Sequence, residues 1–372
     1  MRQVFRGAQI FDGWRLHEGA ALSVEDGCIL GLGPDTGEGI DLGGGLLAPG
    51  FVDLQVNGGG GVLLGQGDPD AALATICAAH RRLGTAGLLP TLITADPDTT
   101  AAVIAAGIRA AQAGLPGFLG LHLEGPHLDP RRKGAHDRAL IRPMEAWDLE
   151  RLLDAARRLP VLMVTLAPEA ASPEQIAALA GAGALVSLGH SDCTEAQARA
   201  AMAAGAGVVT HLYNAMSPMS HRAPGLTGAA LDGSSAVGII PDGVHVAPTP
   251  FRVAARMAEE RLFAVTDSMA LAGTEATEFQ LNDRAIHRRD GRLTLSDGTL
   301  AGADVTMPEA LAWMTGYAGI DRAKALAMTT RRPADLAGRA DLGRLVPGAR
   351  ADLVHLNESW RLTRRWFAGE AG

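Results

Sequence analysis

Short apolar runs alternate with amphipathic stretches through the middle of the chain. Eight runs have the length and composition of buried strands, at residues 51–55, 88–93, 119–123, 161–166, 184–188, 208–210, 237–240 and 262–265. Helical stretches lie between them, at residues 70–83, 99–113, 144–158, 173–180, 194–204 and 250–260. Eight strand–helix units over this length favour a closed (β/α)8 TIM-like barrel, an α/β fold, over an open doubly wound sheet.

The two ends of the chain have a different pattern. Before about residue 47, short apolar runs are broken by Asp12-Gly13 and Asp26-Gly27, and Asp-Gly pairs are turn signals between strands. The tail is again strand-like. We therefore expect a small β-sandwich domain built from residues 1–47 and 340–372, beside a catalytic barrel of residues 48–339.

The segment after the eighth strand has its own pattern. Residues 284–300 are expected to form a β-hairpin around Asp290-Gly291. Three helices should follow, at residues 307–317, 323–329 and about 332–337.

Composition and charge narrow the class of protein. With 47% hydrophobic and 20% charged residues, the 372-residue chain resembles an ordinary globular protein. The net charge of −8 and the lack of a basic stripe argue against a nucleic-acid partner. The first residues lack a signal-peptide core, and no apolar run approaches about 18 residues, so we expect no membrane span and a cytoplasmic location. The three cysteines are far apart and suggest neither a disulfide framework nor a cysteine zinc site: Cys28, Cys77 and Cys193.

Polar side chains follow most of the predicted strands, at the point where each strand stops. These residues are Gln55, Thr94, Glu124, His190, His211, Asp242 with His245, and Asp267. Catalytic groups of a (β/α)8 barrel gather at the carboxyl-terminal rim of its strands. The sequence therefore predicts that these side chains converge at one mouth.

Two histidines at matching strand ends favour a metal or catalytic pair. His190 and His211 end successive strands, and Glu124 supplies a carboxylate where the third strand stops. Two imidazoles and one carboxylate leave an open position for water, as a catalytic zinc site requires. The alternatives are that the histidines are hydrogen-bonded loop residues and that Glu124 forms a structural salt bridge.

A second carboxylate lies at the end of the eighth strand. Asp267 on that rim could accept a proton from water and deliver it to a leaving amine. The alternative role, commoner for an isolated Asp-Ser pair, is to cap a turn.

Three further features leave two interpretations open. Arg222 lies in a Gly/Pro-rich loop, where it could grip a phosphate or carboxylate with two hydrogen bonds or simply be solvated. His136 and His245, taken alone, are more typical of solvated or hydrogen-bonded loop histidines. The Gly58–Gly61 run could be a phosphate cradle or a tight turn, and it lacks the Lys-Ser/Thr of a P-loop.

Several segments together resemble one enzyme family, and they follow one another almost from end to end. They are APGFVDLQVNG (48–58), HLEGPHLDPRRKGAH (122–136), GHSDCT (189–194), HLYNAM (211–216), APGLTGA (223–229), IIPDGVHV (239–246), VTDSM (265–269) and GRLVPGARADLVHL (343–356). On these motifs the chain resembles the N-acetylglucosamine-6-phosphate deacetylases of the amidohydrolase superfamily. The resemblance implies a metal-dependent barrel that hydrolyses N-acetyl-D-glucosamine 6-phosphate to D-glucosamine 6-phosphate and acetate.

The resemblance also implies residue roles. Glu124, His190 and His211 should hold the metal, and Asp267 should be the catalytic acid/base. The remaining implied roles concern the substrate: His136 as a catalytic and sugar-facing residue, Ala135, Asn214, Ala215 and Leu300 around the sugar, and Arg222 and His245 on the phosphate. In many members the phosphate residues act across a homodimer interface.

One departure from the wider superfamily concerns the number of metal ions. Many members have a His-x-His pair after the first strand, where this chain has Gln55-Val56-Asn57. Amides are poor replacements for imidazole on zinc, so we expect one divalent ion and doubt a second tight site. Zn²⁺ suits the ligands best, with Fe²⁺, Co²⁺ or Mn²⁺ as alternatives. The alternative functions are deacetylation of a related sugar, such as N-acetylgalactosamine 6-phosphate, and a non-catalytic sugar-phosphate-binding barrel. A tetramer is the alternative to the homodimer.

Overall fold

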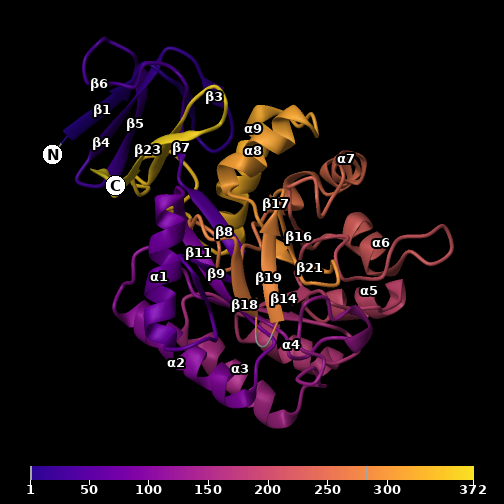
Figure 1. Cartoon of the computed structure of the whole chain (residues 1–372). Helices are drawn as coiled ribbons and strands as arrows, with labels where there is room; N and C mark the ends of the chain where they lie inside the picture. The colour runs from indigo at the N-terminus through magenta and orange to yellow at the C-terminus, as the bar shows by residue number, and fades with distance from the viewer. Residues whose placement is uncertain (1, 282–283) are drawn as a thin grey trace.

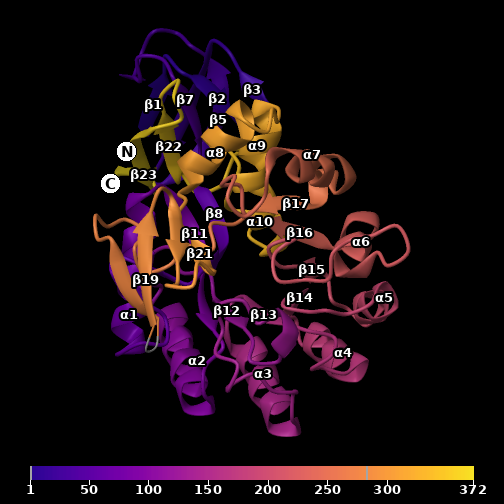
Figure 2. The same cartoon turned by 45° about the vertical axis from the view of Figure 1, so that its right-hand side comes forward.

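Eight parallel strands form the centre of the molecule. The computed structural model describes residues 2–281 and 284–372. The strands are β8 (Phe51–Val56), β11 (Thr85–Ile93), β12 (Leu121–Glu124), β13 (Leu162–Leu166), β14 (Leu185–Leu188), β15 (Val208–Val209), β16 (Ala236–Ile239) and β17 (Leu262–Ala264). Neighbours along the chain are neighbours in the sheet, from β8 at one edge to β17 at the other (Figures 1 and 2). All eight predicted strands are present.

The residues after β17 close the barrel against β8. Asp267 N donates to Gln55 O at 3.0 Å, and Asn57 N donates to Ser268 O at 2.9 Å. Val56 and Ser268 also form an isolated parallel bridge. The predicted (β/α)8 barrel is therefore confirmed, and the backbone of Asp267 is part of its seam.

The outer helices bury one face each against the sheet. The six predicted between barrel strands are α1 (Pro69–Arg82), α2 (Pro97–Gln112), α3 (Ala146–Arg158), α4 (Pro173–Gly181), α5 (Glu195–Ala203) and α7 (Pro248–Met257). Residues at the helix starts explain where the helices begin. Ser172 and Thr194 each form a capping box, and Pro stands in the first turn of four of the six. The three predicted later helices are α8 (Met307–Gly316), α9 (Arg322–Thr329) and α10 (Arg331–Leu336). Among residues 2–281 and 284–372, no helix is both long and apolar enough to cross a bilayer.

One helix, α6 (Gly225–Asp232), was not predicted. Its first seven residues are buried, so it has no polar face along its length. A helix that is apolar on all sides lacks the 3.6-residue alternation by which surface helices are recognised. The sequence pattern gave no prediction for residues 226–232, and the Gly/Pro-rich loop around Arg222 leads directly into this helix.

Strands from both ends of the chain form two further sheets. One sheet is built from the N-terminal segment and contains β1 (Arg2–Arg6), β4 (Ala20–Glu25), β5 (Cys28–Pro34) and β6 (Ile40–Asp41). The other combines strands of both ends and contains β2 (Gln9–Phe11), β3 (Leu16–His17), β7 (Leu46–Pro49), β22 (Leu353–Leu356), β23 (Leu362–Phe367) and β24 (Glu370–Ala371). Head and tail pair directly, because β7 runs antiparallel to β22. The ring centroids of Phe5 and Trp366 lie 4.9 Å apart in the shared core. The expected small β unit is present, and its limits at residues 47 and 340 stay a prediction.

A four-stranded sheet follows the barrel. It consists of β18 (Glu278–Leu281), β19 (Arg284–Arg289), β20 (Arg292–Thr294) and β21 (Leu300–Ala303). The predicted hairpin at Asp290-Gly291 joins β19 to β20, while β18 and β21 were not predicted as strands. Ala303 N donates to Asp267 O at 2.9 Å, so β21 reaches the barrel mouth (Figure 2).

The Gly58–Gly61 run is a tight turn. It links the short strands β9 (Gly58–Gly59) and β10 (Val62–Leu63), with Gly60 and Gly61 at φ 64° and 91°. The N–H groups of Gly58, Gly60 and Gly61 donate to carbonyl oxygens of residues 268–272. Because these donors are already used, the alternative of a phosphate cradle is excluded.

Two buried histidines predict a loss of stability in mild acid. Burial lowers the pKa of His80, in α1, and of His122, in β12, to about 4. In the unfolded chain the pKa of histidine is about 6.5, so the unfolded state takes up these protons first as the pH falls. The contribution to the free energy of unfolding, on the order of 3 kcal/mol per histidine, is present above about pH 6.5 and lost as the pH falls towards 4.

Urea unfolding of His122→Gln checks this expectation. The variant should lose less free energy of unfolding than the wild type between about pH 7 and about pH 4.5. His287→Gln, at an exposed position in β19, is the matched control and should keep the wild-type pH dependence. Equal acid losses in the wild type and His122→Gln would contradict the assignment.

Candidate metal and catalytic site

Four polar side chains reach one rim because each follows a parallel strand. Glu124 is the last residue of β12, His190 and His211 come two residues after β14 and β15, and Asp267 comes three residues after β17. Parallel strands of a closed barrel end at the same face. The structure therefore brings these residues together, as the sequence predicts.

Glu124, His190 and His211 point their ligand atoms at one spot. Glu124 Oε1 lies 3.2 Å from His190 Nε2 and 3.1 Å from His211 Nε2. All three side chains are buried, and their atoms could hold a metal ion. Burial alone would raise the pKa of the Glu124 carboxyl, yet the two neighbouring imidazoles hold that pKa well below the usual value. The carboxyl is therefore an anionic ligand at neutral pH.

The donor set fits a divalent ion. The two Nε2 atoms are 3.0 Å apart, and two N–H groups cannot face each other at that distance. His190 Nδ1 lies 2.9 Å from the Arg132 carbonyl, to which it donates, so its Nε2 presents a lone pair. Three ligands at about 2.0–2.2 Å around a tetrahedral ion would lie roughly 3.3 Å from one another, close to the spacing here.

Asp267 lies beside this cluster in a dry environment. Its Oδ1 accepts hydrogen bonds from Asn57 Nδ2 at 2.7 Å and from Gln55 Nε2 at 3.1 Å. Gln55 Nε2 also donates to Glu124 Oε1 at 3.1 Å, so one amide links the two carboxylates. Burial and then the charge of Glu124 raise the pKa of Asp267 to about 6. A carboxyl with this pKa can both accept and return a proton near neutrality.

The backbone is strained at the same residues. His190, His211, Ala215 and Asp267 have φ of 47°, 30°, 48° and 49°, in the left-handed region. Such a conformation costs a non-glycine residue about 1–3 kcal/mol and persists only where the surroundings enforce it. Strain of this kind clusters at functional sites, and no residue pattern in the sequence reveals it.

His136 faces the cluster as a neutral donor. Thr94 N donates to His136 Nδ1 at 3.3 Å, which places the remaining ring proton on Nε2. Burial, followed by the nearby His190, lowers the pKa of His136 to about 3. The ring stands 4.4 Å from that of His190, centroid to centroid. His136 can therefore offer an N–H to a ligand without adding positive charge.

These side chains line a cavity of about 250 Å³. Besides the four rim residues, the sequence-predicted residues that line it are Ala135, His136, Asn214, Ala215, His245 and Leu300. Residues not predicted as binding residues also line it: Asn57, Ile93, Gly134, Ile240, Met269 and Thr299. Asp242 Oδ2 holds His245 Nδ1 at 2.6 Å, which fixes the direction of that ring.

Arg222 is a predicted site residue that does not lie at this cavity. It is exposed and does not line the cavity. The loop that leads into α6 projects away from the barrel in Figure 1. Within one chain, therefore, Arg222 does not complete the site.

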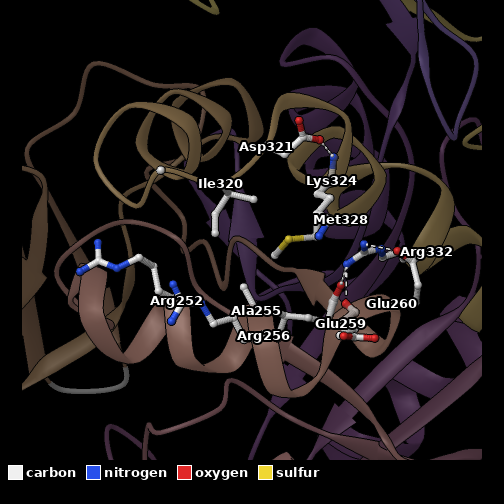
Figure 3. A pocket seen from close by; sticks show the side chains of 12 residues that line it. Arg252, Ala255, Arg256, Glu259, Glu260, Ile320, Asp321, Lys324, Met328 and Arg332 are labelled. Atoms are coloured by element: carbon white, nitrogen blue, oxygen red, sulfur yellow. Dashed lines mark hydrogen bonds and ion pairs between the residues drawn. The ribbon is translucent and has the colours of Figure 1, made fainter.

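A second, slightly larger cavity shows that volume does not identify the site. It measures about 310 Å³ and lies between α7 and α9 (Figure 3). Its described lining residues include no histidine or cysteine. Its buried guanidinium, Arg332, already donates to Glu259 O and Leu262 O and to the Glu260 carboxylate. The buried guanidinium of this cavity is used in bonds to neighbouring segments. The polar groups at the barrel rim, in contrast, point at one spot.

Comparisons with known proteins agree with this geometry. The model of the amidohydrolase family matches residues 46–368. An N-acetylgalactosamine-6-phosphate deacetylase of Shewanella sp. (strain ANA-3) is 38% identical, over 98% of this chain and 94% of the relative. The N-acetylglucosamine-6-phosphate deacetylase of Homo sapiens is 35% identical, over 89% of this chain and 84% of the relative.

A solved structure is similar over the whole chain. The crystal structure of N-acetylglucosamine-6-phosphate deacetylase from Pasteurella multocida has a TM-score of 0.95 and 33% identity, and each chain is covered completely. The family match covers most of the sequence, and the rim of the barrel carries a candidate site for the divalent metal on which amidohydrolases typically depend. This chain belongs to the amidohydrolase family, within the group of the N-acetylglucosamine-6-phosphate and N-acetylgalactosamine-6-phosphate deacetylases.

Proposed function

We propose that this protein is a metal-dependent deacetylase that hydrolyses N-acetyl-D-glucosamine 6-phosphate to D-glucosamine 6-phosphate and acetate. The observation that carries the proposal is the convergence of Glu124, His190 and His211 with Asp267 around one cavity. Relatives that cover most of the chain are named as deacetylases of this sugar phosphate and of its galacto epimer.

In this proposal Glu124, His190 and His211 hold one divalent ion. Two imidazoles and one carboxylate suit Zn²⁺ best, and Fe²⁺, Co²⁺ or Mn²⁺ accept the same donors. When bound, such an ion acts as a Lewis acid on water and on the acetamido carbonyl. Gln55 donates its amide N–H groups to the two carboxylates, so it offers no lone pair for a second ion from that nitrogen.

Asp267 moves the proton. It accepts a proton from the attacking water as the new carbon–oxygen bond forms. It then returns that proton to the sugar nitrogen as the carbon–nitrogen bond breaks, because an amine leaves far more readily than an amide anion. A pKa raised to about 6 by burial suits both steps.

The remaining cavity residues orient the substrate. His136 Nε2–H donates to the carbonyl oxygen as negative charge develops there. Ala135, Asn214, Ala215 and Leu300 surround the sugar. Contacts on the distant phosphate then hold the amide in position for attack.

The galacto epimer is the second candidate substrate. The observation in its favour is the 38% identity, over 98% of this chain, to an N-acetylgalactosamine-6-phosphate deacetylase. The two sugars differ only in the orientation of the hydroxyl at C4, and both carry the same acetamido group and phosphate. Both therefore present the same reacting atoms to the site.

Acetate release from each epimer tests the proposal. The purified protein is assayed before chelation, after chelation and after zinc is added back. We expect release that chelation abolishes and zinc restores, and the ratio of kcat/KM for the two epimers then gives the preferred substrate. No release from either sugar by folded, metal-loaded protein would refute the deacetylase function and favour a binding-only barrel.

Arg222 and His245 are proposed to bind the phosphate across a homodimer. Arg222 is exposed in a loop that projects from the molecule, whereas His245 lines the cavity. A hydrogen bond to a charged group contributes about 1.5–3 kcal/mol, so Arg222→Ala should raise KM about 10- to 100-fold with little change in kcat. Steady-state kinetics with the 6-phosphate and with phosphate-free N-acetylglucosamine measure this, and only the phosphorylated sugar should show the effect.

Mixing two variants that are each expected to be slow at low substrate concentration tests whether Arg222 acts on the neighbouring site. In a mixed dimer of Arg222→Ala and Asp267→Asn subunits, one site receives an intact Asp267 from one chain and an intact Arg222 from the other. Mixing after dissociation should therefore restore part of the wild-type turnover at low substrate concentration. If mixing restores nothing although mixed dimers form, Arg222 does not act in trans.

We also propose a cytoplasmic location. The three cysteines are free, which suits a reducing compartment. Fractionation of cells that produce the native protein, with acetate release as the readout, checks this.

A further inference from the structure

A chain of buried polar side chains lies beneath Asp267. Thr266 Oγ1 donates to Asp53 Oδ2 at 2.6 Å, and Ser268 Oγ lies 3.0 Å from Thr266 Oγ1. His80 Nε2 follows, 3.4 Å from Ser268 Oγ and 2.9 Å from the carbonyl of Gly58. All four side chains are buried, yet none of them lines the cavity.

The hydrogen bonds of this chain differ in length and in how their protons are shared. The Thr266 hydroxyl is the donor towards both Asp53 Oδ2 and Ser268 Oγ. Because a hydroxyl has a single proton, that proton serves chiefly the shorter contact, with Asp53. His80 Nε2–H donates to the Gly58 carbonyl at 2.9 Å and shares that proton with Ser268 Oγ at 3.4 Å. The Asp53 carboxyl also accepts the backbone N–H groups of Gln55 and Thr266, at 3.2 and 3.3 Å. The bond between Thr266 and Asp53 is therefore the strongest link, Ser268 and His80 pack against it through longer contacts, and a buried polar network of this kind restrains its members.

The chain holds the two residues on either side of Asp267. Thr266 precedes it and Ser268 follows it, and Asp267 itself has φ of 49°. A left-handed aspartate returns to an ordinary conformation unless its neighbours are fixed. The backbone of Asp267 and Ser268 is also tied to β8, through Gln55 O and Asn57 N.

We propose that Asp53, Thr266, Ser268 and His80 are positioning residues that fix the backbone of Asp267 and so aim its carboxylate at the reacting atoms. Helix α1 takes part through His80, and strand β8 through Asp53. The inference rests on the proposed function for the role of Asp267 in proton transfer. The four positioning residues contact neither the substrate nor the atoms with which Glu124, His190 and His211 would bind the metal.

Two substitutions at Thr266 form the central test. Thr266→Val keeps the shape and removes the hydroxyl, whereas Thr266→Ser keeps the hydroxyl and removes a methyl group. We expect Thr266→Val to lower kcat about 10- to 100-fold, the loss typical of removing a group that orients a site residue, with KM and metal content near wild type. Thr266→Ser should keep kcat within about threefold of wild type. Equal losses in both variants, or a normal kcat in Thr266→Val, would overturn the proposal.

Thr329→Val is the matched control. Thr329 is fully buried in α9, its hydroxyl donates to the Leu326 carbonyl within its own helix, and it does not line the cavity. The same substitution there should leave kcat unchanged. If Thr266→Val does not fold, Ser268→Ala removes the next link with a smaller change and should lower kcat in the same direction. Unchanged kcat in a folded Ser268→Ala protein would then overturn the proposal.

A crystal structure of the Thr266→Val variant, or of Ser268→Ala in its place, separates this inference from the proposed function. We expect the Asp267 carboxylate to leave its 2.7 Å contact with Asn57 Nδ2. If the wild type releases no acetate from either sugar, the proposed function fails, and the position of this carboxylate still decides the inference. An unmoved carboxylate and unmoved backbone at Asp267 would overturn it.

Discussion

Replacing Asp267 with asparagine is expected to lower kcat about 100- to 10,000-fold while the protein keeps its metal. General acid–base catalysis by a positioned group contributes a factor of this size, and an amide can neither accept nor return the proton. The substitution preserves the surroundings, since an amide oxygen can still accept the hydrogen bonds from Asn57 and Gln55. Steady-state kinetics together with elemental analysis of the purified variant measure both quantities.

The comparison with chelated wild-type protein makes this result specific. Chelation should remove both metal and turnover, whereas Asp267→Asn should remove turnover alone. Substrate binding by the variant, measured calorimetrically, should stay close to that of the wild type because the cavity shape is unchanged. Near-normal turnover in Asp267→Asn would show that another group moves the proton.

The rim residues could be predicted from the sequence because short apolar runs mark where the barrel strands end. Glu124, His190, His211 and Asp267 each follow a short apolar run, and a closed parallel barrel has one carboxyl-terminal face. The same logic predicted the cavity position of His245, which follows the seventh strand. His136 could not be placed in this way, because it lies 12 residues beyond the end of β12, and the resemblance alone suggested its role.

Other features depend on contacts that no local pattern records. Helix α6 is apolar on all sides, so its periodicity is hidden. The left-handed backbone of Ala215 and its neighbours arises from tertiary hydrogen bonds. Ser268 and His80 are separated by 188 positions along the chain, and only the folded barrel brings their side chains within 3.4 Å of each other. Buried networks of this kind are visible only after the strands are in register.

Removing the carboxylate from the proposed metal site is expected to abolish metal binding. Glu124→Gln replaces the only anionic ligand of the three with an amide, which is a poor ligand for zinc. The wild type should contain about one metal ion per chain, and free zinc at 100 times its Kd should stabilise it by about 2.7 kcal/mol. The variant should contain little metal, show no zinc-dependent rise in Tm and lose turnover. Elemental analysis and thermal unfolding with and without zinc measure these outcomes.

The control for this substitution is Asp148→Asn. Asp148 is also a buried carboxylate, but it pairs with Arg142 at the start of α3 and does not line the cavity. Breaking that pair should lower the Tm, because it leaves a partly buried guanidinium without its partner, and should leave the metal content and the zinc-dependent stabilisation intact. A variant that only lowers the Tm can therefore be distinguished from one that loses the metal site. A Glu124→Gln protein that still binds one equivalent of zinc and turns over substrate would show that the ion is held elsewhere, and the assignment of Glu124, His190 and His211 would fall with it.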